Sequence, residues 1–249
     1  MTQTVLVTGA NRGIGKGLIT HYLSHPNTTV IGTVRDIASP AAQSLPTTLP
    51  KAPGSSLLLV PLTLDDPSSA SSAASILQTQ YNITHIDILI ASAGICNHWG
   101  PVHEMTDSDV LSHFEINTLG PLRVYKAFAS LLKNADMPKF VYISTLLASI
   151  AGVEQLASSL ATAYGMSKVA GNFLVKKIEA ENEWLVTLAV DPGLVQTEMG
   201  SRNAQFIGLE EAPVTVEDTV RGITAQIEAA TKSTTSGQFV NFGGERVAW

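Results

Sequence analysis

Cysteine is nearly absent from this sequence, which limits both the covalent links and the metal chemistry available to the chain. Among 249 residues there is one cysteine, Cys96, so an intramolecular disulfide cannot form. We interpret Cys96 as a small buried thiol that follows a strand. One thiol and scattered carboxylates do not support a metal site, and we expect none. The six histidines show no recognisable ligand spacing and are interpreted as structural or surface residues: His21, His25, His85, His98, His103 and His113.

Positive charge and long apolar runs are also scarce. The chain has 15 Lys and Arg residues against 21 Asp and Glu residues, a net charge of −6. A mildly acidic protein has no long-range attraction for nucleic acid or an anionic membrane, so we expect neither as a partner. No stretch approaches the roughly 18 apolar residues of a membrane span. The first residues lack the basic and apolar regions of a signal peptide, from which we expect a cytoplasmic protein.

Apolar residues, by contrast, are plentiful at 45%, and their pattern predicts an α/β fold. Short apolar runs alternate with longer helical stretches, as in parallel strands joined by crossover helices. We predict a single domain over residues 1–249, a doubly wound parallel sheet with helices on both faces. Residues 37–55, with four prolines, are predicted to form a loop or a broken helix. The predicted strands are Thr4–Thr8, Val30–Val34, Ser56–Leu62, Ile86–Ser92, Phe140–Ser144, Leu185–Val190 and Gly237–Asn241.

The segment Thr8–Gly15 lies where the first strand is predicted to pass into a helix. Its glycines permit positive φ angles and let backbone N–H groups approach a pyrophosphate at the positive end of the helix. A P-loop is excluded, because Ala10 stands where its first glycine belongs and Gly17 replaces its metal-binding hydroxyl. A mere tight turn is the alternative, which the position at a strand–helix junction disfavours. We assign cofactor contacts to Gly9, Asn11, Arg12, Gly13, Ile14 and Gly15.

The end of the second predicted strand indicates which dinucleotide binds. Folds that select NAD place a carboxylate here for the ribose 2′-hydroxyl, whereas folds that select NADP use a cation for the 2′-phosphate. Val34 occupies the expected position of the acid, and Arg35 follows it. We expect Arg12 to clamp the same phosphate. The alternative is a surface ion pair between Arg35 and Asp36. The prediction is therefore NADP(H) as the cofactor.

Tyr164 and Lys168 are spaced i, i+4 at the start of a helical stretch, which puts phenol and ammonium on one face. Acid–base work at neutral pH needs a tyrosine pKa lowered by about three units, or about 4 kcal/mol. One cation at about 4 Å supplies about that much at an effective dielectric constant of 20. We therefore expect Lys168 to lower the pKa of Tyr164, although a YxxxK pattern alone is frequent by chance.

Taken together and in this order, the motifs resemble those of the short-chain dehydrogenases/reductases, from residue 4 to Trp249. Thr8–Gly15 resembles the family's TGxxxGxG turn, Tyr164–Lys168 its YxxxK pair and Asp191–Thr197 its PGxVxT segment. Ala91–Gly94 stands in the place of its NNAG motif, and Asn117 in that of its catalytic asparagine. Finer features, in residues 193–199, 212–218 and 237–249, are similar to fungal norsolorinic-acid-type ketoreductases and to C-factor/Sniffer-type carbonyl reductases.

The resemblance implies a Rossmann-type fold and an enzyme that reduces a small or aromatic, polyketide-like carbonyl compound. Tyr164 would donate a proton to the carbonyl oxygen as hydride leaves the nicotinamide, and Lys168 would also bind the ribose hydroxyls. Asn117 would help hold a water that relays protons to Lys168. Residues 200–213 would form a substrate lid, and we expect a homodimer or homotetramer. The further cofactor contacts implied are Thr63, Leu64, Ser92, Ala93, Gly94, Asn117, Tyr164, Lys168, Pro192, Gly193, Val195 and Thr197.

Three departures from the family pattern bear on the site. Ala91-Ser92 replaces an asparagine pair, so contacts that stabilise the central sheet must come from elsewhere. The acid expected after the third strand aligns with Thr63, and Asp65 and Asp66 come slightly later. The catalytic serine position aligns with Thr145, preceded by Ser144, and about six extra residues separate it from Tyr164. Because side chains alternate along a strand, only one of these hydroxyls faces the nicotinamide. The alignment favours Thr145, with Ser144 the open alternative.

Two functional alternatives stay open from the sequence. One is NADP-dependent alcohol oxidation, the same chemistry in reverse. The other is a non-catalytic NADP(H)-binding sensor or scaffold of the same fold, which typically loses Tyr164 or Lys168. Trp99, after the fourth predicted strand, either borders the substrate cleft or packs against its surroundings.

Overall fold

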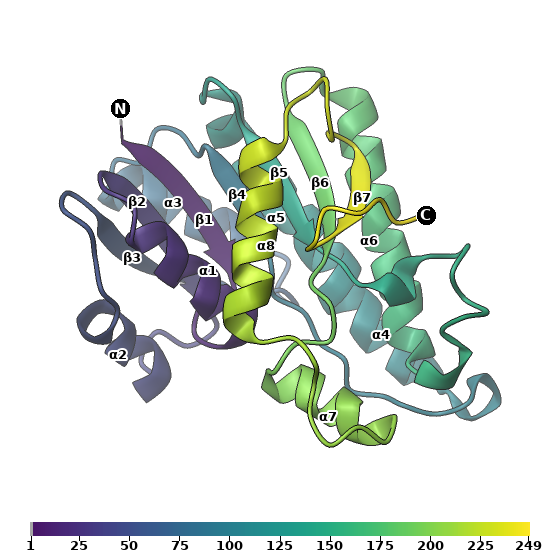
Figure 1. Cartoon of the computed structure of the whole chain (residues 1–249). Helices are drawn as coiled ribbons and strands as arrows, with labels where there is room; N and C mark the ends of the chain where they lie inside the picture. Colours follow the sequence, from purple (N-terminus) through teal and green to yellow (C-terminus); the bar gives the residue numbers. More distant parts are fainter. Residues whose placement is uncertain (1) are drawn as a thin grey trace.

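The computed structural model describes residues 2–249 and consists of one parallel sheet covered by helices on both faces (Figure 1). The seven strands pair in the order β3-β2-β1-β4-β5-β6-β7, and every pairing is parallel. This confirms the predicted doubly wound, Rossmann-type sheet. The strands are β1 (Gln3–Thr8), β2 (Thr28–Val34), β3 (Ser56–Pro61), β4 (Ile88–Ala91), β5 (Lys139–Ile143), β6 (Val186–Asp191) and β7 (Gln238–Asn241).

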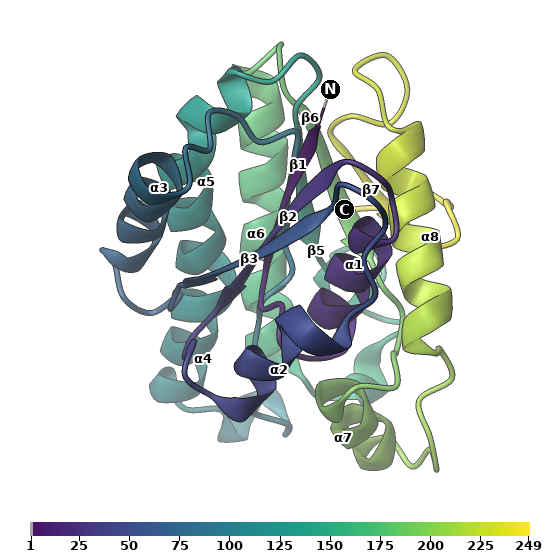
Figure 2. The ribbon, with the colours of Figure 1, turned by 90° about the vertical axis from the view of Figure 1, so that its left-hand side faces the viewer.

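The helices form two layers, one on each face of the sheet (Figure 2). One layer holds α1 (Gly13–Leu23) and α8 (Val216–Ala229). The other holds α3 (Ser69–Gln80), α5 (Gly120–Lys133) and α6 (Thr162–Glu181). The remaining α-helices are α2 (Pro40–Thr48), α4 (Asp107–Phe114) and α7 (Glu198–Phe206). No helix within residues 2–249 is long and apolar enough to cross a membrane.

The two layers exist because successive side chains of each strand point to opposite faces. In β1, Val5 and Val7 pack towards α1 and α8, whereas Leu6 packs towards α3 and α5. All three side chains are fully buried. The near-continuous apolar strands of the sequence are the expected signature of a parallel sheet covered on both sides.

The segment 37–55 contains a helix that the prolines do not prevent. Ser39 caps α2 by accepting a hydrogen bond from the Ala42 N–H, and Pro40 occupies the first turn, where a missing N–H costs nothing. Pro46 lies inside the nine-residue helix, near its end. The prediction of a loop or broken helix was therefore wrong for residues 40–48, because N-terminal capping and burial of Ala42 and Leu45 outweigh the proline.

The strand order reverses between β1 and β4, and this reversal positions the site. From β1 the chain builds outward to β2 and β3, then returns to place β4 on the other side of β1. The crossovers therefore diverge above the carboxyl ends of β1 and β4. Such a switch point is where parallel α/β sheets bind ligands.

Candidate active site

A cavity of about 610 Å³ lies at the carboxyl edge of the sheet, lined by the loops that follow strands β1 to β6. Most residues predicted from the sequence meet there. From the glycine turn and β2 these are Gly9, Asn11, Arg12, Gly13, Ile14, Gly15 and Arg35. From β3 and β4 they are Leu64, Ser92, Ala93 and Gly94; from β5 and α6, Ser144, Thr145, Tyr164 and Lys168; and after β6, Pro192, Gly193, Val195 and Thr197.

Thr63 is a predicted cofactor contact that does not line the cavity. Among residues 2–249 the cavity lining includes Leu62, Leu64 and Asp65 but not Thr63. The Thr63 N–H instead donates to the hydroxyl of Ser69 at the start of α3, at 2.9 Å. The alignment placed the family's acid at Thr63, whereas the carboxylate that reaches the cavity is Asp65, two residues later.

The glycine turn stays open to the cavity because its glycines have no side chains. Gly9 and Gly13 have φ angles of +71° and +52°, in the region that L-residues rarely adopt. A Cβ on Gly15 would lie 2.2 Å from the carbonyl oxygen of Gly9. The turn leads directly into α1, whose N-terminal N–H groups face the cavity. An open glycine cradle at a helix N-terminus fits the pyrophosphate of a dinucleotide.

The replacement for the missing asparagine pair lies in β1. The hydroxyl oxygen of Thr8 accepts hydrogen bonds from the N–H groups of Ser92 and Ala93, both at 3.0 Å. These bonds tie the loop after β4 to the end of β1. The central sheet therefore keeps a cross-strand link without the amide side chains.

Arg35 and Arg12, the two cations expected to bind the 2′-phosphate, both line the cavity. Arg35 lines the cavity at the end of β2. Within residues 2–249 no ion pair joins it to Asp36, whose carboxylate accepts the Ala38 N–H at 2.8 Å. Arg12 also lines the cavity and forms an ion pair with Glu198 at the start of α7. The surface pair between Arg35 and Asp36 is therefore not formed.

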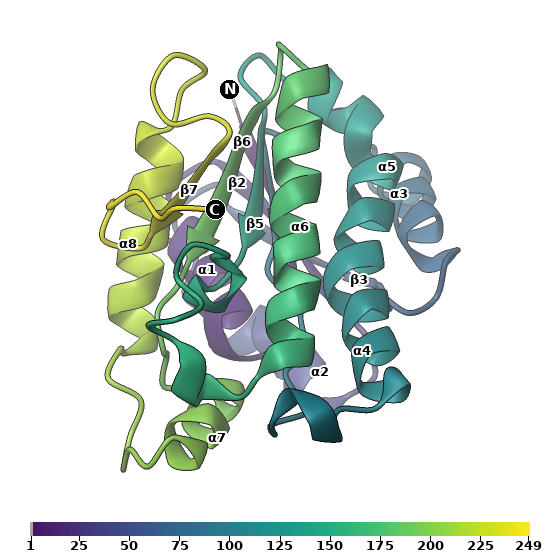
Figure 3. The ribbon, with the colours of Figure 1, turned by 90° about the vertical axis from the view of Figure 1, so that its right-hand side faces the viewer.

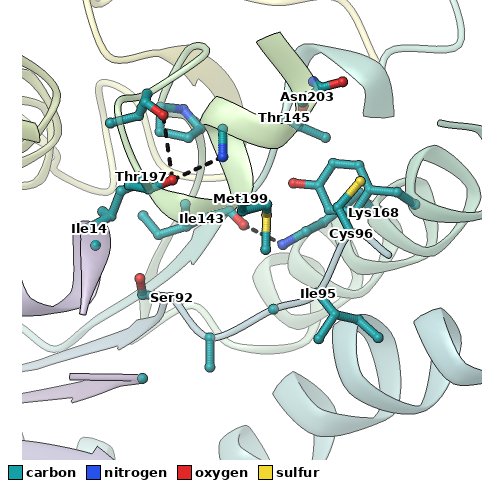
Figure 4. A pocket seen from close by; sticks show the side chains of 18 of the residues that line it. Ile14, Ser92, Ile95, Cys96, Ile143, Thr145, Lys168, Thr197, Met199 and Asn203 are labelled. Carbon is teal, nitrogen blue, oxygen red and sulfur yellow. Dashed lines mark hydrogen bonds between the residues drawn. The ribbon is translucent and has the colours of Figure 1, made fainter. Parts of the chain in front are cut away.

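Tyr164 and Lys168 line the cavity from the first two turns of α6, the helix that faces the viewer in Figure 3. Figure 4 shows the Lys168 side chain in the cavity. The Lys168 ammonium is 5.7 Å from the centre of the Tyr164 ring and donates to the carbonyl oxygen of Ile143 at 2.7 Å. Burial lowers the pKa of Lys168 to about 7. Burial raises the pKa of Tyr164, and a hydrogen bond with the Thr145 side chain acts in the opposite direction.

The expectation that Lys168 depresses the pKa of Tyr164 does not hold in the chain alone. Lys168 is buried and Tyr164 is partly buried at the cavity wall, and desolvation penalises phenolate and ammonium alike. The sequence argument counted the attraction between the two charges but not the cost of burying each. Burial therefore favours the neutral phenol of Tyr164 in the chain without cofactor.

The two candidate hydroxyls after β5 have different surroundings. The Ser144 side chain is 1% exposed and donates to Asn172 Oδ1 at 2.6 Å, pointing into the protein. Thr145 lines the cavity (Figure 4), and its side chain forms a hydrogen bond with Tyr164. The extra residues before Tyr164 form a loop at the cavity mouth, where Gln155, Leu156, Ser158 and Ser159 line it. The extra residues therefore lie outside β5, which ends at Ile143.

Asn117 lies directly behind the cavity wall, fully buried in the π-helical turn η2 (Glu115–Leu119). Its amide donates to Ile95 O at 2.9 Å and to Ser167 Oγ at 3.0 Å, and its Oδ1 accepts from the Ile95 N–H at 2.8 Å. A Cβ on Gly94 would lie 3.0 Å from Asn117 Oδ1. Such π-turns frequently occur at functional sites, where they re-aim a side chain.

Tyr142, in β5, is a site residue that the sequence analysis missed. Its fully buried ring lies under Lys168, whose ammonium is 4.5 Å from the ring centre, and its hydroxyl donates to the Asn117 carbonyl oxygen at 2.8 Å. Gly171 leaves room for this ring, since a Cβ there would lie 2.3 Å from the hydroxyl. The sequence signal that could have identified Tyr142 is a tyrosine hydroxyl within an otherwise apolar strand.

The outer part of the cavity is covered by α7. Met199, Gly200, Arg202, Asn203 and Ile207 line it. Trp99 is not in the lining; its Nε1 donates to Asn203 Oδ1 at 3.2 Å, and its ring centre lies 6.1 Å from that of Phe206. Trp99 therefore packs against α7, the second of the two roles considered. The segment predicted as a lid is helical from Glu198, two residues before the predicted start.

The family of the chain follows from a sequence comparison. The model of the short chain dehydrogenase family matches residues 3–207. This chain belongs to the short-chain dehydrogenase family. It is 42% identical to norsolorinic acid ketoreductase nor1 of Dothistroma septosporum, with 99% of this chain and 92% of that protein covered. It is 40% identical to norsolorinic acid ketoreductase stcE of Emericella nidulans, with 98% and 92% covered.

Solved structures agree with this membership. The NADPH-bound carbonyl reductase from chicken fatty liver superposes with a TM-score of 0.87 at 30% identity, covering 100% of this chain and 99% of that one. The carbonyl reductase Sniffer of Drosophila melanogaster has a TM-score of 0.84 at 22% identity, covering 100% of both chains, which supports the fold. The resemblance inferred from the motifs is confirmed.

Proposed function

We propose that this chain is an NADPH-dependent ketoreductase that acts on an aromatic, polyketide-like ketone, with Tyr164 as the proton donor. The observation that carries the proposal is the meeting of Tyr164, Lys168 and Thr145 at the inner end of one cavity whose outer end is the glycine cradle. A dinucleotide in this cradle supplies the hydride. A non-catalytic relative would typically lose Tyr164 or Lys168, and this chain has both.

The residues act on the proton and on the carbonyl oxygen. Because burial raises its pKa, Tyr164 is protonated and ready to donate its hydrogen to the developing alkoxide. The Thr145 hydroxyl, beside the phenol, donates a second hydrogen bond to the same oxygen and orients it. Lys168 would stabilise the phenolate that remains, and its amino group, which donates to the Ile143 carbonyl oxygen, would also hold the ribose hydroxyls of a bound cofactor.

NADPH is favoured over NADH by two arginines and no competing acid. Arg35 and Arg12 line the cavity where the 2′-phosphate of NADPH would bind, and Val34 leaves no carboxylate to repel it. Arg12 must exchange its Glu198 partner for the phosphate. Charge-assisted contacts of this kind contribute roughly 1.5–3 kcal/mol each.

The substrate class rests on the cavity walls and on the relatives. Leu147, Leu156, Met199 and Ile207 give the outer cavity apolar walls, and Gln155 and Asn203 add hydrogen-bonding groups. Flat aromatic ketones with ring hydroxyls match such a surface. The relatives named for norsolorinic acid reduction support the same class.

The test is an NADPH-consumption assay over hydroxylated aryl ketones, aliphatic ketones and aldehydes. We expect turnover with aryl ketones and a kcat/KM for NADPH roughly tenfold to a hundredfold above that for NADH. Arg35→Ala should remove most of this preference without abolishing turnover with NADH. Equal values for the two cofactors in the wild type would contradict the cofactor assignment.

A further inference from the structure

Three side chains that the catalytic site does not use converge at the far end of α1 from the glycine turn. His21 lies in the last turn of α1, His25 shortly after it, and Glu228 in the last turn of α8. One potential ligand atom from each lies within 4.8 Å of the other two. The His21 Nε2 and Glu228 Oε1 atoms are 3.9 Å apart.

The sequence analysis found no ligand spacing among the histidines, and the folded chain brings two of them together. His21 lies in α1 and His25 follows the end of that helix, with the two ring centres 4.7 Å apart. The third group comes from the other end of the chain. Glu228 meets the pair only because α1 and α8 pack side by side (Figure 2).

The close contact between the two helices fixes this meeting. A Cβ on Gly17 would lie 2.7 Å from a methyl group of Val220, so the glycine lets α8 approach α1 closely. Val220, Ile223 and Ile227 of α8 and Leu18, Ile19 and Tyr22 of α1 belong to one buried cluster. The positions of His21 and Glu228 are therefore set by the packed core beneath them.

Each ring keeps one nitrogen that no hydrogen bond within residues 2–249 occupies. His21 Nε2 has almost no solvent exposure and finds no hydrogen-bond partner within residues 2–249. His25 Nδ1 lies 3.0 Å from the His21 carbonyl oxygen, so this nitrogen carries the proton. The lone pair of the neutral His25 ring is then on Nε2. A ring N–H bound to a carbonyl is the usual support of a metal-binding imidazole.

We propose that His21, His25 and Glu228 bind one Zn²⁺ ion, with a fourth position open to water. Two imidazoles and a carboxylate are a donor set that zinc prefers, whereas Mg²⁺ and Ca²⁺ prefer oxygen ligands alone. Tetrahedral zinc with bonds of about 2.0–2.2 Å holds its ligand atoms about 3.3–3.6 Å apart. The exposed His25 and Glu228 side chains can close the present spacing by rotation.

The ion would stabilise the folded protein and would take no part in the reaction. At 1.5 Å per residue, His21 lies about 12 Å along α1 from Gly13 in the cavity lining. The ion cross-links the C-terminal ends of α1 and α8. Helix α8 also supports the cofactor loop, because the Thr219 hydroxyl donates to the Pro192 carbonyl oxygen at 2.7 Å. Zinc should therefore raise the melting temperature of the protein.

The experiment titrates tag-free protein with ZnCl₂ by calorimetry and with Co²⁺ by visible absorption. We expect one ion per chain, a dissociation constant of about micromolar magnitude and the absorption bands of four-coordinate cobalt. His25→Gln and Glu228→Gln should each weaken binding roughly tenfold or more and remove the zinc-dependent rise in melting temperature. His85→Gln, which changes a histidine paired with Asp87 elsewhere, is the matched control and should bind as the wild type does.

Three results would overturn the proposal. The first is the absence of stoichiometric binding in the wild type, which would leave His21 and Glu228 as an ordinary ion pair. The second is unchanged affinity in Glu228→Gln, which would rule out the bridge between helices. The third is loss of binding in Cys96→Ser, which would place the ion at the thiol. NADPH binding by each variant shows that it has folded.

Discussion

At the scale of single residues, the two hydroxyls after β5 differ in their hydrogen-bond partners. Ser144 is committed to Asn172, whereas Thr145 lies beside the Tyr164 phenol. Thr145→Ala should lower kcat/KM by about tenfold to a thousandfold, as loss of one positioned donor commonly does. Ser144→Ala should change it only a few-fold. Both variants are measured with one ketone, and a crippled Ser144→Ala enzyme beside an active Thr145→Ala enzyme would reverse the assignment.

Lys168 is a buried cation, and its cost to the fold should be measurable. Burial lowers its pKa from 10.5 to about 7 in the folded chain. Between these values the unfolded chain binds the extra proton, so the stability of the wild type rises with pH from about 7 towards 10. Below about pH 7 the ammonium is charged in both states, and its full penalty applies.

Lys168→Met should therefore raise the free energy of unfolding at pH 7 by about 1–3 kcal/mol in the cofactor-free protein. The same substitution should abolish turnover and weaken NADPH binding. Urea unfolding of both proteins at pH 6, 7, 8 and 9 checks this. The difference should shrink as the pH rises; a difference that grows with pH would have the wrong sign.

At the scale of elements, the π-turn η2 depends on a neighbouring strand. Tyr142 in β5 donates its hydroxyl to the Asn117 carbonyl, and the ring supports Lys168 from below. Tyr142→Phe keeps the ring but leaves a buried carbonyl without its donor. We expect the free energy of unfolding to fall by about 1–2 kcal/mol. The kcat should fall several-fold, with the KM for NADPH nearly unchanged.

The control for this variant is Tyr125→Phe, which removes a hydroxyl from a half-buried tyrosine on α5 that is not bonded to η2. It should leave kcat at the wild-type level. Equal losses of kcat in the two variants would mean that the Tyr142 hydroxyl has only a general packing role.

Local pattern predicted the elements better than it predicted contacts between them. All seven strands lie within two residues of their expected bounds, because apolar runs bounded by polar residues report burial directly. The Gly9–Gly15 turn was found because its glycines are adjacent in sequence. Tyr142, Thr63 and the partners of Thr8 were missed or misplaced, because their roles depend on residues that only the folded sheet brings near. The His21–Glu228 contact is of the same kind.

At the scale of the whole molecule, one cavity joins the two ends of the proposed reaction. The glycine turn and Arg35 lie at one end, and Tyr164 and Lys168 at the other, with α7 over the mouth. The Arg12–Glu198 pair links the turn to α7, so a residue proposed to bind the cofactor also contacts the segment proposed as a lid. The expected cytoplasmic location and the homodimer or homotetramer stay predictions.

The central claim is that Tyr164 supplies the proton to a ketone reduced by NADPH. The most direct measurement compares the wild type with Tyr164→Phe, using NADPH and one hydroxylated aryl ketone, together with NADPH affinity by fluorescence. The substitution removes the hydroxyl and keeps the ring, so NADPH affinity should change little while kcat falls by a factor of about 10² or more. A Tyr164→Phe enzyme that retains more than about a tenth of the wild-type kcat would show that another acid protonates the substrate.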